Sequence, residues 1–385
     1  MNQSNPVSRP RRVLQVTDNH SPGHPGVTAV VTQIARYLGH RGWPVTILAA
    51  GQAEGELPPG VELLEFPLLW GGNSWRYTPD FLRYLEKGAA GSGDILHLHG
   101  VWGAPQWQAA RFAARRGLPA LLSPHDMLSP WHWQDGRLRP LKKRLYWWAL
   151  ASPAFRRLSL VHAITAAERD ALAGQFPGIR LEVIPNAIDL GEADAALATA
   201  AEPLDLEAPY LLFLSRLHPK KGIDLLLGAY ARARNRGNWR LLIVGPDWSA
   251  AYTAGLKDLA RSLGLEGRVR FLGPVFGAGK WQLYRQAQAL CLPSYSEVVG
   301  LVNLEAAAAR KPVITTHETG LLDWEQSGGL LVHPRVEELT AALEAVFSWT
   351  ESEREGRGRA LRQLVERRYS WEAVGPRWLE LYRAL

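Results

Sequence analysis

Short apolar runs alternate along this chain with segments whose apolar residues recur every three or four positions. Residues 12–18 (RVLQVTD) and 44–50 (PVTILAA) are runs of the first kind. Between them, over 27–38, aliphatic residues recur at the spacing of one helix face. A strand, a helix and a strand in succession form a βαβ unit, which predicts a parallel sheet.

This alternation occurs as two series, which predicts an α/β fold with two Rossmann-like doubly wound domains. The first series continues through VELLEFP, DILHLHG, LPALLSP, LSLVHAIT and RLEVIPN, and the second comprises YLLFLSRL, WRLLIVGP, RVRFLGPV, ALCLPS, PVITT and GLLVH. We expect domains at 1–189 and 210–370, with an alanine- and acid-rich linker region at 190–209. A terminal helix at 371–385 carries an apolar stripe and should pack back on the N-terminal domain.

Composition narrows the function without deciding it. The 385 residues are 46% apolar and 21% charged, as in globular proteins, and the net charge of +7 favours anionic partners. Such partners include nucleotides, a phosphorylated acceptor, nucleic acid and an acidic membrane face. The single cysteine, Cys291, excludes an intramolecular disulfide and fits a reducing compartment. Neither a signal peptide nor a membrane-spanning stretch is apparent, so we expect a cytoplasmic protein, soluble or peripheral on the inner membrane.

Basic residues follow the first strand of the second series. In open α/β sheets, ligands bind beyond the carboxyl ends of the strands. Arg216 comes just after one strand, and Lys220, Lys221 and Gly222 precede a helical segment. An arginine and a lysine at this place can converge on one anion, and the alternative is solvated surface charge.

Two glutamates lie eight positions apart within residues 293–315. Glu297 is expected in the loop after a strand and Glu305 in the second turn of a helix. The main-chain N–H groups near Gly300 and Leu301 open that helix and form a second anion cradle. The carboxylates would accept hydrogen bonds from sugar hydroxyls, although Glu305 could instead form a structural salt bridge with an arginine.

Three histidines stand near strand ends of the first series, namely His97, His99 and His125. A zinc site is not predicted, because no cysteine or acidic residue has the diagnostic spacing. Gly23 and Gly26 follow the first strand, where they would allow close backbone approach or form a flexible surface loop.

Several of these segments together resemble retaining glycosyltransferases of family 4. SRLHPKKG, GPVF and PSYSEVVGLVNLEAAAARKPVIT are similar to the nucleotide-binding half of that family, and IPNAID (184–189) resembles the signature that ends its first domain. The resemblance covers nearly the whole chain. It implies the GT-B fold, in which two Rossmann-like domains face each other across a cleft.

The resemblance also implies roles for individual residues of the second domain. Arg216 and Lys221 would hold the donor diphosphate, Glu305 the ribose, and Glu297 the donor sugar. The remaining expected donor contacts are Gly26, Pro274, Val275, Val299, Gly300 and Leu301. The chain departs from the family where EVVGL replaces Glu-Gly-Phe-Gly-Leu and where Ala187 replaces glycine. Val298 and Val299 stand at the expected donor-sugar pocket.

The first domain supplies the expected acceptor side. HLHGVW and SPHDML resemble segments of bacterial surface-polysaccharide members. His125 would hydrogen-bond the donor sugar or the attacking hydroxyl and counts as catalytic with Arg216, Lys221 and Glu297. The expected acceptor contacts are His99, Trp102, Asp126 and Trp131, and Asp126 could alternatively cap a helix. The chain has 16 tryptophans. Core packing is the better prediction for any single one in the first-domain loops, but as a group about half are expected to line the acceptor cleft. The loop tryptophans are Trp70, Trp75, Trp102, Trp107, Trp131 and Trp133.

Residues 136–158 combine basic side chains with Tyr146, Trp147 and Trp148. This pattern suits an anionic membrane surface, and equally a helix with one buried aromatic face and one solvated basic face. RNA binding is a third interpretation that no RNA-binding motif supports.

We therefore predict a retaining, metal-independent glycosyltransferase without a cofactor. It would move a sugar from a GDP- or UDP-sugar to a saccharide acceptor, expected to be lipid-linked, in cell-surface polysaccharide synthesis. No nucleic-acid partner is expected. The alternatives are another GT-B enzyme, such as a phosphorylase or a nucleotide-sugar epimerase, and a non-catalytic relative that binds membranes or glycans.

Overall fold

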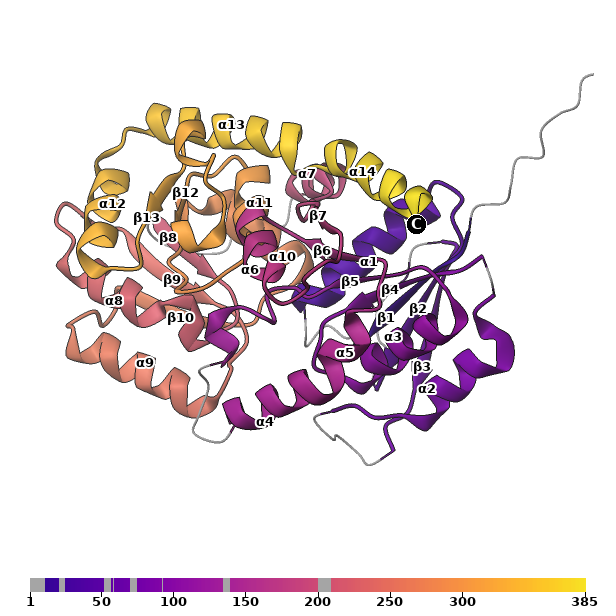
Figure 1. Cartoon of the computed structure of the whole chain (residues 1–385). Helices are drawn as coiled ribbons and strands as arrows, with labels where there is room; N and C mark the ends of the chain where they lie inside the picture. Colours follow the sequence, from indigo (N-terminus) through magenta and orange to yellow (C-terminus); the bar gives the residue numbers. More distant parts are fainter. Residues whose placement is uncertain are drawn as a thin grey trace, which may run out of the picture. The chain divides into compact units, whose positions relative to one another are not determined.

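The computed structural model describes residues 11–20, 25–51, 57, 59–69, 75–91, 93–133, 139–199 and 209–385 (Figure 1). The chain divides into two compact units. The first comprises Met1–Pro185 and Gly375–Leu385, and the second comprises Asn186–Val374. In the part of the chain that is described, no helix combines the length and apolar character needed to cross a bilayer.

The first unit contains a parallel sheet of seven strands in the order β3-β2-β1-β4-β5-β6-β7. Every residue of β1, β2, β4, β5 and β6 is buried, as expected for a parallel sheet with both faces covered. The strands are β1 (Val13–Thr17), β2 (Val45–Ala50), β3 (Val61–Phe66), β4 (Ile95–His99), β5 (Ala120–Ser123), β6 (Leu160–Ala163) and β7 (Leu181–Val183).

Helices follow most of these strands, as the periodicity predicts. They are α1 (Pro25–Gly39), α2 (Pro79–Tyr84), η1 (Leu85–Ala89), α3 (Ala104–Arg116), η2 (Pro130–Trp133), α4 (Arg139–Tyr146), η3 (Trp147–Ala151), α5 (Ser152–Phe155) and α6 (Ala166–Ala173). The terminal helix α14 (Trp371–Ala384) belongs to the first unit from Gly375 onward. A Cβ atom on Gly375 would lie 2.0 Å from the Tyr37 ring, so this segment runs very close to α1.

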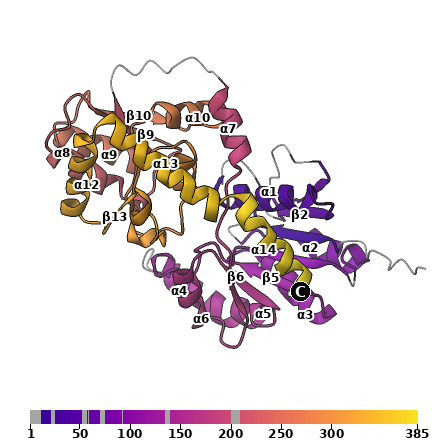
Figure 2. The ribbon, with the colours of Figure 1, turned by 90° about the horizontal axis from the view of Figure 1, so that it is seen from above.

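The second unit contains a parallel sheet of six strands in the order β10-β9-β8-β11-β12-β13. The strands are β8 (Tyr210–Leu214), β9 (Arg240–Val244), β10 (Val269–Gly273), β11 (Ala289–Leu292), β12 (Val313–Thr316) and β13 (Leu330–Val332). The helices are α7 (Leu190–Ala198), η4 (Pro219–Lys221), α8 (Ile223–Arg232), α9 (Ala250–Ser262), α10 (Gly277–Gln286), α11 (Leu301–Ala308), η5 (His317–Thr319), η6 (Glu325–Ser327), α12 (Val336–Ser348) and α13 (Glu351–Arg368). Helices α8 and α12 lie side by side (Figure 2).

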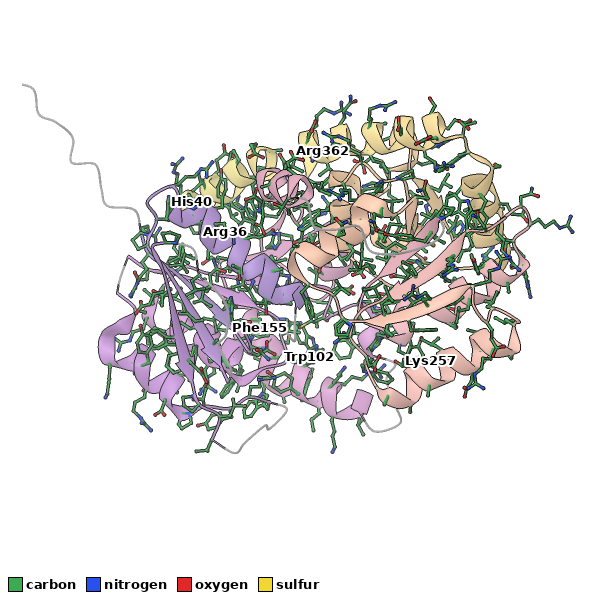
Figure 3. All side chains as sticks on the ribbon, turned by 180° about the vertical axis from the view of Figure 1, so that it is seen from behind. Arg36, His40, Trp102, Phe155, Lys257 and Arg362 are labelled. Atoms are coloured by element: carbon green, nitrogen blue, oxygen red, sulfur yellow. The ribbon has the colours of Figure 1, made fainter. Side chains whose placement is uncertain are left out.

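The expected linker region at 190–209 is helical in its first half. Asp189 caps α7 by accepting the Glu192 N–H at 2.9 Å, and residues 200–208 lie outside the described residues. Arg362, a nearly buried residue of α13 labelled in Figure 3, donates to both carboxylate oxygens of Asp194 at 2.8 Å. Because this bidentate pair fixes α7 to α13, the segment is part of the second unit.

Candidate active site

The loop after β8 carries the arginine Arg216 at the carboxyl edge of the second sheet. Arg216 is exposed, and it forms no hydrogen bond or ion pair with any residue that the structure describes. The loop is held closely by its neighbours, because a Cβ on Gly245 would lie 1.9 Å from the Ser215 carbonyl oxygen. A Cβ on Gly222 would lie 2.2 Å from the Pro293 carbonyl oxygen, so the loops after β8 and β11 also meet here.

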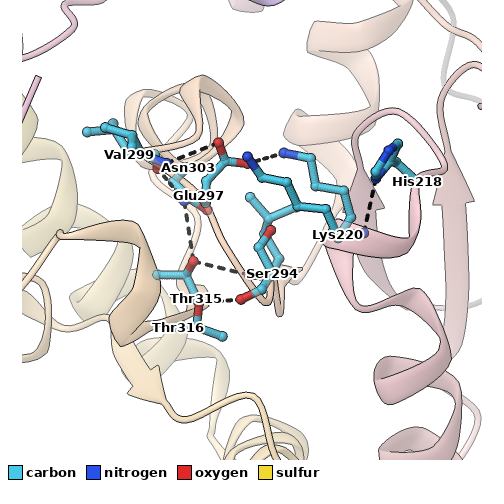
Figure 4. A network of polar contacts seen from close by, with 11 residues as sticks. His218, Lys220, Ser294, Glu297, Val299, Asn303, Thr315 and Thr316 are labelled. Atoms are coloured by element: carbon cyan, nitrogen blue, oxygen red, sulfur yellow. Dashed lines mark hydrogen bonds and ion pairs between the residues drawn. The ribbon is translucent and has the colours of Figure 1, made fainter. Parts of the chain in front are cut away.

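Lys221 and Glu297 form an ion pair at this edge (Figure 4). Their side chains are only 16% and 12% exposed, respectively. Burial opposes ionisation of Glu297, but the charges of Lys221 and Lys220 and the Lys221 hydrogen bond outweigh it, so the pKa of Glu297 is lowered. Glu297 is therefore an ionised hydrogen-bond acceptor at neutral pH, and Lys221 is held beside it.

The Val299–Gly300 step has an unusual backbone. Both residues have positive φ, 67° and 63°, which is rare for a β-branched residue such as valine. The conformation is held by hydrogen bonds from Val299 N–H to the Thr319 carbonyl at 2.8 Å and from Asn303 Nδ2 to the Val299 carbonyl at 2.7 Å. The Val299 side chain is fully buried, so it is not presented to a ligand.

Glu305 is held by two residues of α10. Lys280 Nζ lies 2.7 Å from Oε1, and the Tyr284 hydroxyl donates to Oε2 at 2.8 Å. The arginine salt bridge considered from the sequence is thus replaced by a lysine and a tyrosine. Because a carboxylate offers about four lone-pair sites, Glu305 retains capacity for further donors such as ribose hydroxyls.

The loop after β10 lies at the same edge, since the six strands are parallel. Pro274 is exposed, Val275 is half-buried, and Phe276 is 56% exposed before α10 begins. Helix α11 begins at Leu301, four positions after Glu297 of the ion pair. Its first N–H groups have no partner within the helix, as at any helix start, so they can bind an anion.

In the first unit, the loop after β5 carries two residues in the left-handed region. His125 has a φ of 53° and Asp126 a φ of 63°. His125 Nε2 lies 2.9 Å from His99 Nδ1, and the Asp126 N–H donates to Glu168 Oε1 at 2.9 Å. The structure thus brings together His99, His125 and Asp126. The main-chain N–H of Asp126 is bonded to a glutamate of α6.

The other first-unit candidates occupy different settings. Trp102 is half-buried and donates from Nε1 to the Met127 carbonyl at 3.1 Å, beside the His125 loop. Trp131 is half-buried in η2, Gly26 is exposed in the first turn of α1, and Gly23 lies outside the described residues. Most of the loop tryptophans pack on other rings; Trp70 lies outside the described residues. The ring contacts are Trp75–Trp107, Trp102–Trp133 and Trp133–Trp147.

A chain of four hydrogen bonds in the first unit links residues of β6, β5 and β4 to the terminal helix α14. The Ile184 carbonyl can only accept, so His162 Nε2 donates to it at 2.7 Å. Burial lowers the pKa of His162 to about 4, so the ring is neutral and Nδ1 accepts from the Ser123 hydroxyl at 2.8 Å. Ser123 then accepts from His97 Nε2 at 2.7 Å, and His97 Nδ1 accepts from the Tyr382 hydroxyl at 2.7 Å. The donor and acceptor needs of each bond are therefore met, with both histidines neutral.

Among the described residues, no group of three or more His, Cys, Asp or Glu side chains could hold a metal ion. Burial also lowers the pKa of His125, to about 3, and the pKa of His99 is lowered well below its ordinary value. The His99 and His125 rings are therefore neutral and hydrogen-bonded to each other.

The sequence of the two halves matches known enzyme families. Residues 25–187 match the family Glycosyl transferase 4-like domain, and residues 197–360 match Glycosyl transferases group 1. A D-inositol 3-phosphate glycosyltransferase of Actinosynnema mirum is 30% identical over 349 residues, covering 80% of this chain and 80% of that protein. The chain belongs to glycosyltransferase family 4. The resemblance found in the sequence is confirmed.

This family 4 glycosyltransferase is also similar to solved structures. Anabaena HepE, solved in complex with UDP and glucose, gives a TM-score of 0.77 at 20% identity, covering 97% of this chain and 100% of that one. WaaG, described as a glycosyltransferase involved in lipopolysaccharide biosynthesis, gives a TM-score of 0.69 at 19% identity, covering 92% and 95%. At such identities the likeness concerns the fold, and it confirms the prediction of a GT-B protein with two Rossmann-like domains.

Sequence reasoning did not single out three residues that hold candidate residues in place within their own units. Lys280 and Tyr284 stand four positions apart in a helical stretch, a spacing that places both on one helix face. Glu168 follows Thr165 by three positions, which is the pattern of a helix-capping box. These local signals were present, but neither identifies the partner on the other element, which is the Glu305 carboxylate for the first pair and the Asp126 N–H for Glu168.

Proposed function

We propose that this protein transfers a sugar from a nucleoside-diphosphate donor to an acceptor hydroxyl with retention of configuration. The observation that carries the proposal is the carboxyl edge of the second sheet. There an exposed Arg216 without an ionic partner among the described residues, the Lys221–Glu297 pair and the first turn of α11 are brought together by neighbouring strand ends. HepE, which was solved with UDP and glucose, supports the choice of donor class.

Each group has a role in this proposal. Arg216, Lys221 and the α11 N–H groups neutralise the diphosphate, whose negative charge grows as the glycosidic bond breaks. Glu297 accepts hydrogen bonds from the donor sugar and Glu305 from the ribose. The nucleobase lies against Pro274 and Val275, with Gly26 facing the phosphates. No metal ion or cofactor is needed, because the cations of the chain supply the positive charge.

The chemical step balances without a protein nucleophile. The acceptor hydroxyl attacks the anomeric carbon from the face that the leaving group vacates, and the carbon–oxygen bond to phosphate breaks. The acceptor proton passes to the departing phosphate oxygen, which gives the glycoside and a nucleoside diphosphate. His125 hydrogen-bonds the donor sugar or the attacking hydroxyl, and the acceptor is bound by His99, Trp102, Asp126 and Trp131.

The experiment is an assay of the purified protein with UDP-, GDP- and ADP-sugars and saccharide acceptors. Anomeric NMR signals of the product report retention, and the same assay in excess chelator reports metal dependence. Conversion of the nucleotide sugar without an acceptor would favour the epimerase alternative. Inverted product, or activity that chelator abolishes and a divalent ion restores, would refute the corresponding part of the proposal.

The acceptor is proposed to be a lipid-linked saccharide at an anionic membrane, in cell-surface polysaccharide synthesis. Leu141, Leu145 and Trp148 are spaced along one face of α4 and η3, and they are 68%, 63% and 78% exposed. The buried aromatic face of this segment is separate, because Tyr146 and Trp147 pack on Trp75 and Phe176. An exposed apolar face therefore accompanies the basic residues Lys142, Lys143 and Arg144. This combination is typical of interfacial helices.

Vesicle flotation tests this part of the proposal. The protein should bind vesicles containing phosphatidylglycerol more strongly than neutral vesicles, and Leu145→Ser with Trp148→Ser should reduce binding about tenfold or more. Trp248→Ser, at another exposed tryptophan, is the matched control. Equal binding by all variants would contradict the membrane role. Transfer to soluble inositol phosphate alone would favour the acceptor class in the name of the Actinosynnema relative.

A further inference from the structure

Glu168 is a buried carboxylate in the first unit that the proposed function does not use. It occupies the third position of α6, where the Thr165 hydroxyl accepts the Glu168 N–H at 3.1 Å. A glutamate at this position ordinarily bonds back to the N–H of the capping residue. Here Oε2 accepts the Ile164 N–H at 2.7 Å, and Oε1 accepts the Asp126 N–H at 2.9 Å. One carboxylate thus joins the end of β6 to the loop after β5.

That loop needs an external support. His125 and Asp126 both have positive φ, 53° and 63°, a region in which side chains other than glycine are strained. Aspartate and histidine tolerate this region better than most residues, but two such residues in succession still cost free energy that the surrounding structure must offset. Because Glu168 is only 8% exposed and accepts the Asp126 N–H, it fixes the second residue of the turn from the protein interior.

The turn determines where the His125 ring lies. Its Nε2 is 2.9 Å from Nδ1 of His99, a completely buried residue of β4. Its Nδ1 forms no hydrogen bond with any described residue, and the ring is partly exposed. One ring nitrogen is therefore held, and the other is presented. This arrangement persists only while the His125–Asp126 backbone keeps its left-handed conformation.

We infer that Glu168 is a positioning residue, which holds the His125–Asp126 turn so that the His125 ring presents one nitrogen to the substrate. The inference rests on the proposed role of His125 in glycosyl transfer. Glu168 acts through the Asp126 main chain and touches no substrate. Burial raises the pKa of Glu168 to about 7, and the Ile164 and Asp126 N–H groups limit this rise because they stabilise the ionised form.

Glu168→Gln is the direct test, because the amide keeps the size of the side chain but has only one acceptor oxygen. One of the two N–H groups then loses its acceptor. We expect kcat to fall about 10- to 100-fold, the scale of a slightly misplaced catalytic group, with donor KM within about twofold. Glu353→Gln is the matched control. Glu353 has the same position in α13 but forms an ordinary capping box with Thr350. Its kcat should equal that of the wild type.

A double-mutant cycle with His125→Ala separates positioning from general weakening of the fold. If Glu168 acts through His125, adding Glu168→Gln to His125→Ala should change kcat less than twofold. Losses that multiply would overturn the inference, as would wild-type kcat in Glu168→Gln. If Glu168→Gln does not fold, Glu168→Asp, which keeps the charge and withdraws it by one methylene, takes its place in the same cycle.

NMR of the histidine ring nitrogens gives a readout that does not depend on turnover. In Glu168→Gln the His125 ring signals should shift, while those of the exposed His40 should not (Figure 3). Unchanged His125 signals would overturn the positioning role. If the wild-type protein transfers no sugar but the His125 signals respond, the proposed function fails and the structural coupling stands.

Discussion

Lowering the pH should unfold the first unit before the second. His97 and His99 are fully buried and His162 is 1% exposed, and burial lowers the pKa of all three below the ordinary value of about 6.5. Below pH 6.5 the unfolded chain binds protons on these side chains and the folded chain does not. The contribution of these neutral histidines to the unfolding free energy is therefore fully present above about pH 6.5 and is lost as the pH falls.

Glu168 contributes with the opposite sign. Its folded pKa of about 7 exceeds the model-peptide value near 4.5, so the folded chain holds an extra proton between these values. The stability linked to Glu168 is present at low pH and is lost as the pH rises toward 7. Near pH 5.5, unfolding adds about three protons to the three histidines and releases about one from Glu168, so the unfolded chain binds about two more protons than the folded chain. The difference is about three protons if the half-buried His125 is included. The unfolding free energy should then fall by roughly 2.7–4 kcal/mol per pH unit.

Hydrogen exchange measured by mass spectrometry between pH 5 and 7 tests this slope, after correction for intrinsic exchange rates. Peptides that cover β4, β5 and β6 should lose protection steeply. Peptides from β8 and β11 serve as the internal control, because no histidine is buried among the described residues of the second unit. His162→Gln should reduce the slope by about one proton, or 1.4 kcal/mol per pH unit, whereas His40→Gln should leave it unchanged. Equal slopes in both units would refute the reasoning.

Two further predictions concern the second unit. Lys221→Ala should cost about 2.7–4 kcal/mol of transition-state stabilisation, seen as a loss in kcat of about 100- to 1,000-fold. Lys257→Ala, on α9, is its control, and near-wild-type turnover in Lys221→Ala would remove that lysine from the mechanism. Gly245→Ala should lower the unfolding free energy by about 1–3 kcal/mol, since its Cβ would lie 1.9 Å from a carbonyl oxygen. Gly255→Ala, with open space around its Cβ, should raise stability slightly in the same urea titration, and equal effects would contradict the packing argument.

The apolar periodicity of the chain sufficed to predict the two parallel sheets. Whether a stretch forms a strand or a helix depends largely on neighbouring residues, and those patterns are visible in the sequence. The candidate donor residues follow from the same pattern, because parallel strands place their carboxyl ends at one edge. The positions of Arg216, Lys221 and Glu297 just after strands therefore suffice to select them as candidates.

The pairing of these side chains was decided only by tertiary structure. Lys221 and Glu297 are 76 positions apart, and His97 and Tyr382 are 285 apart, so no local pattern relates them. The linker region shows the same limit, since its helix is fixed by a buried arginine of α13.

Val299 gives the sharpest contrast between the two kinds of information. The family resemblance implied that it lies beside the donor sugar, at a position where the chain departs from the family pattern. In the structure a positive φ of 67° and a hydrogen bond to the Thr319 carbonyl turn the side chain into the core. The sequence determines which residues reach the site, because strand ends are local features. Packing against distant segments determines whether each side chain is presented there or buried in the core.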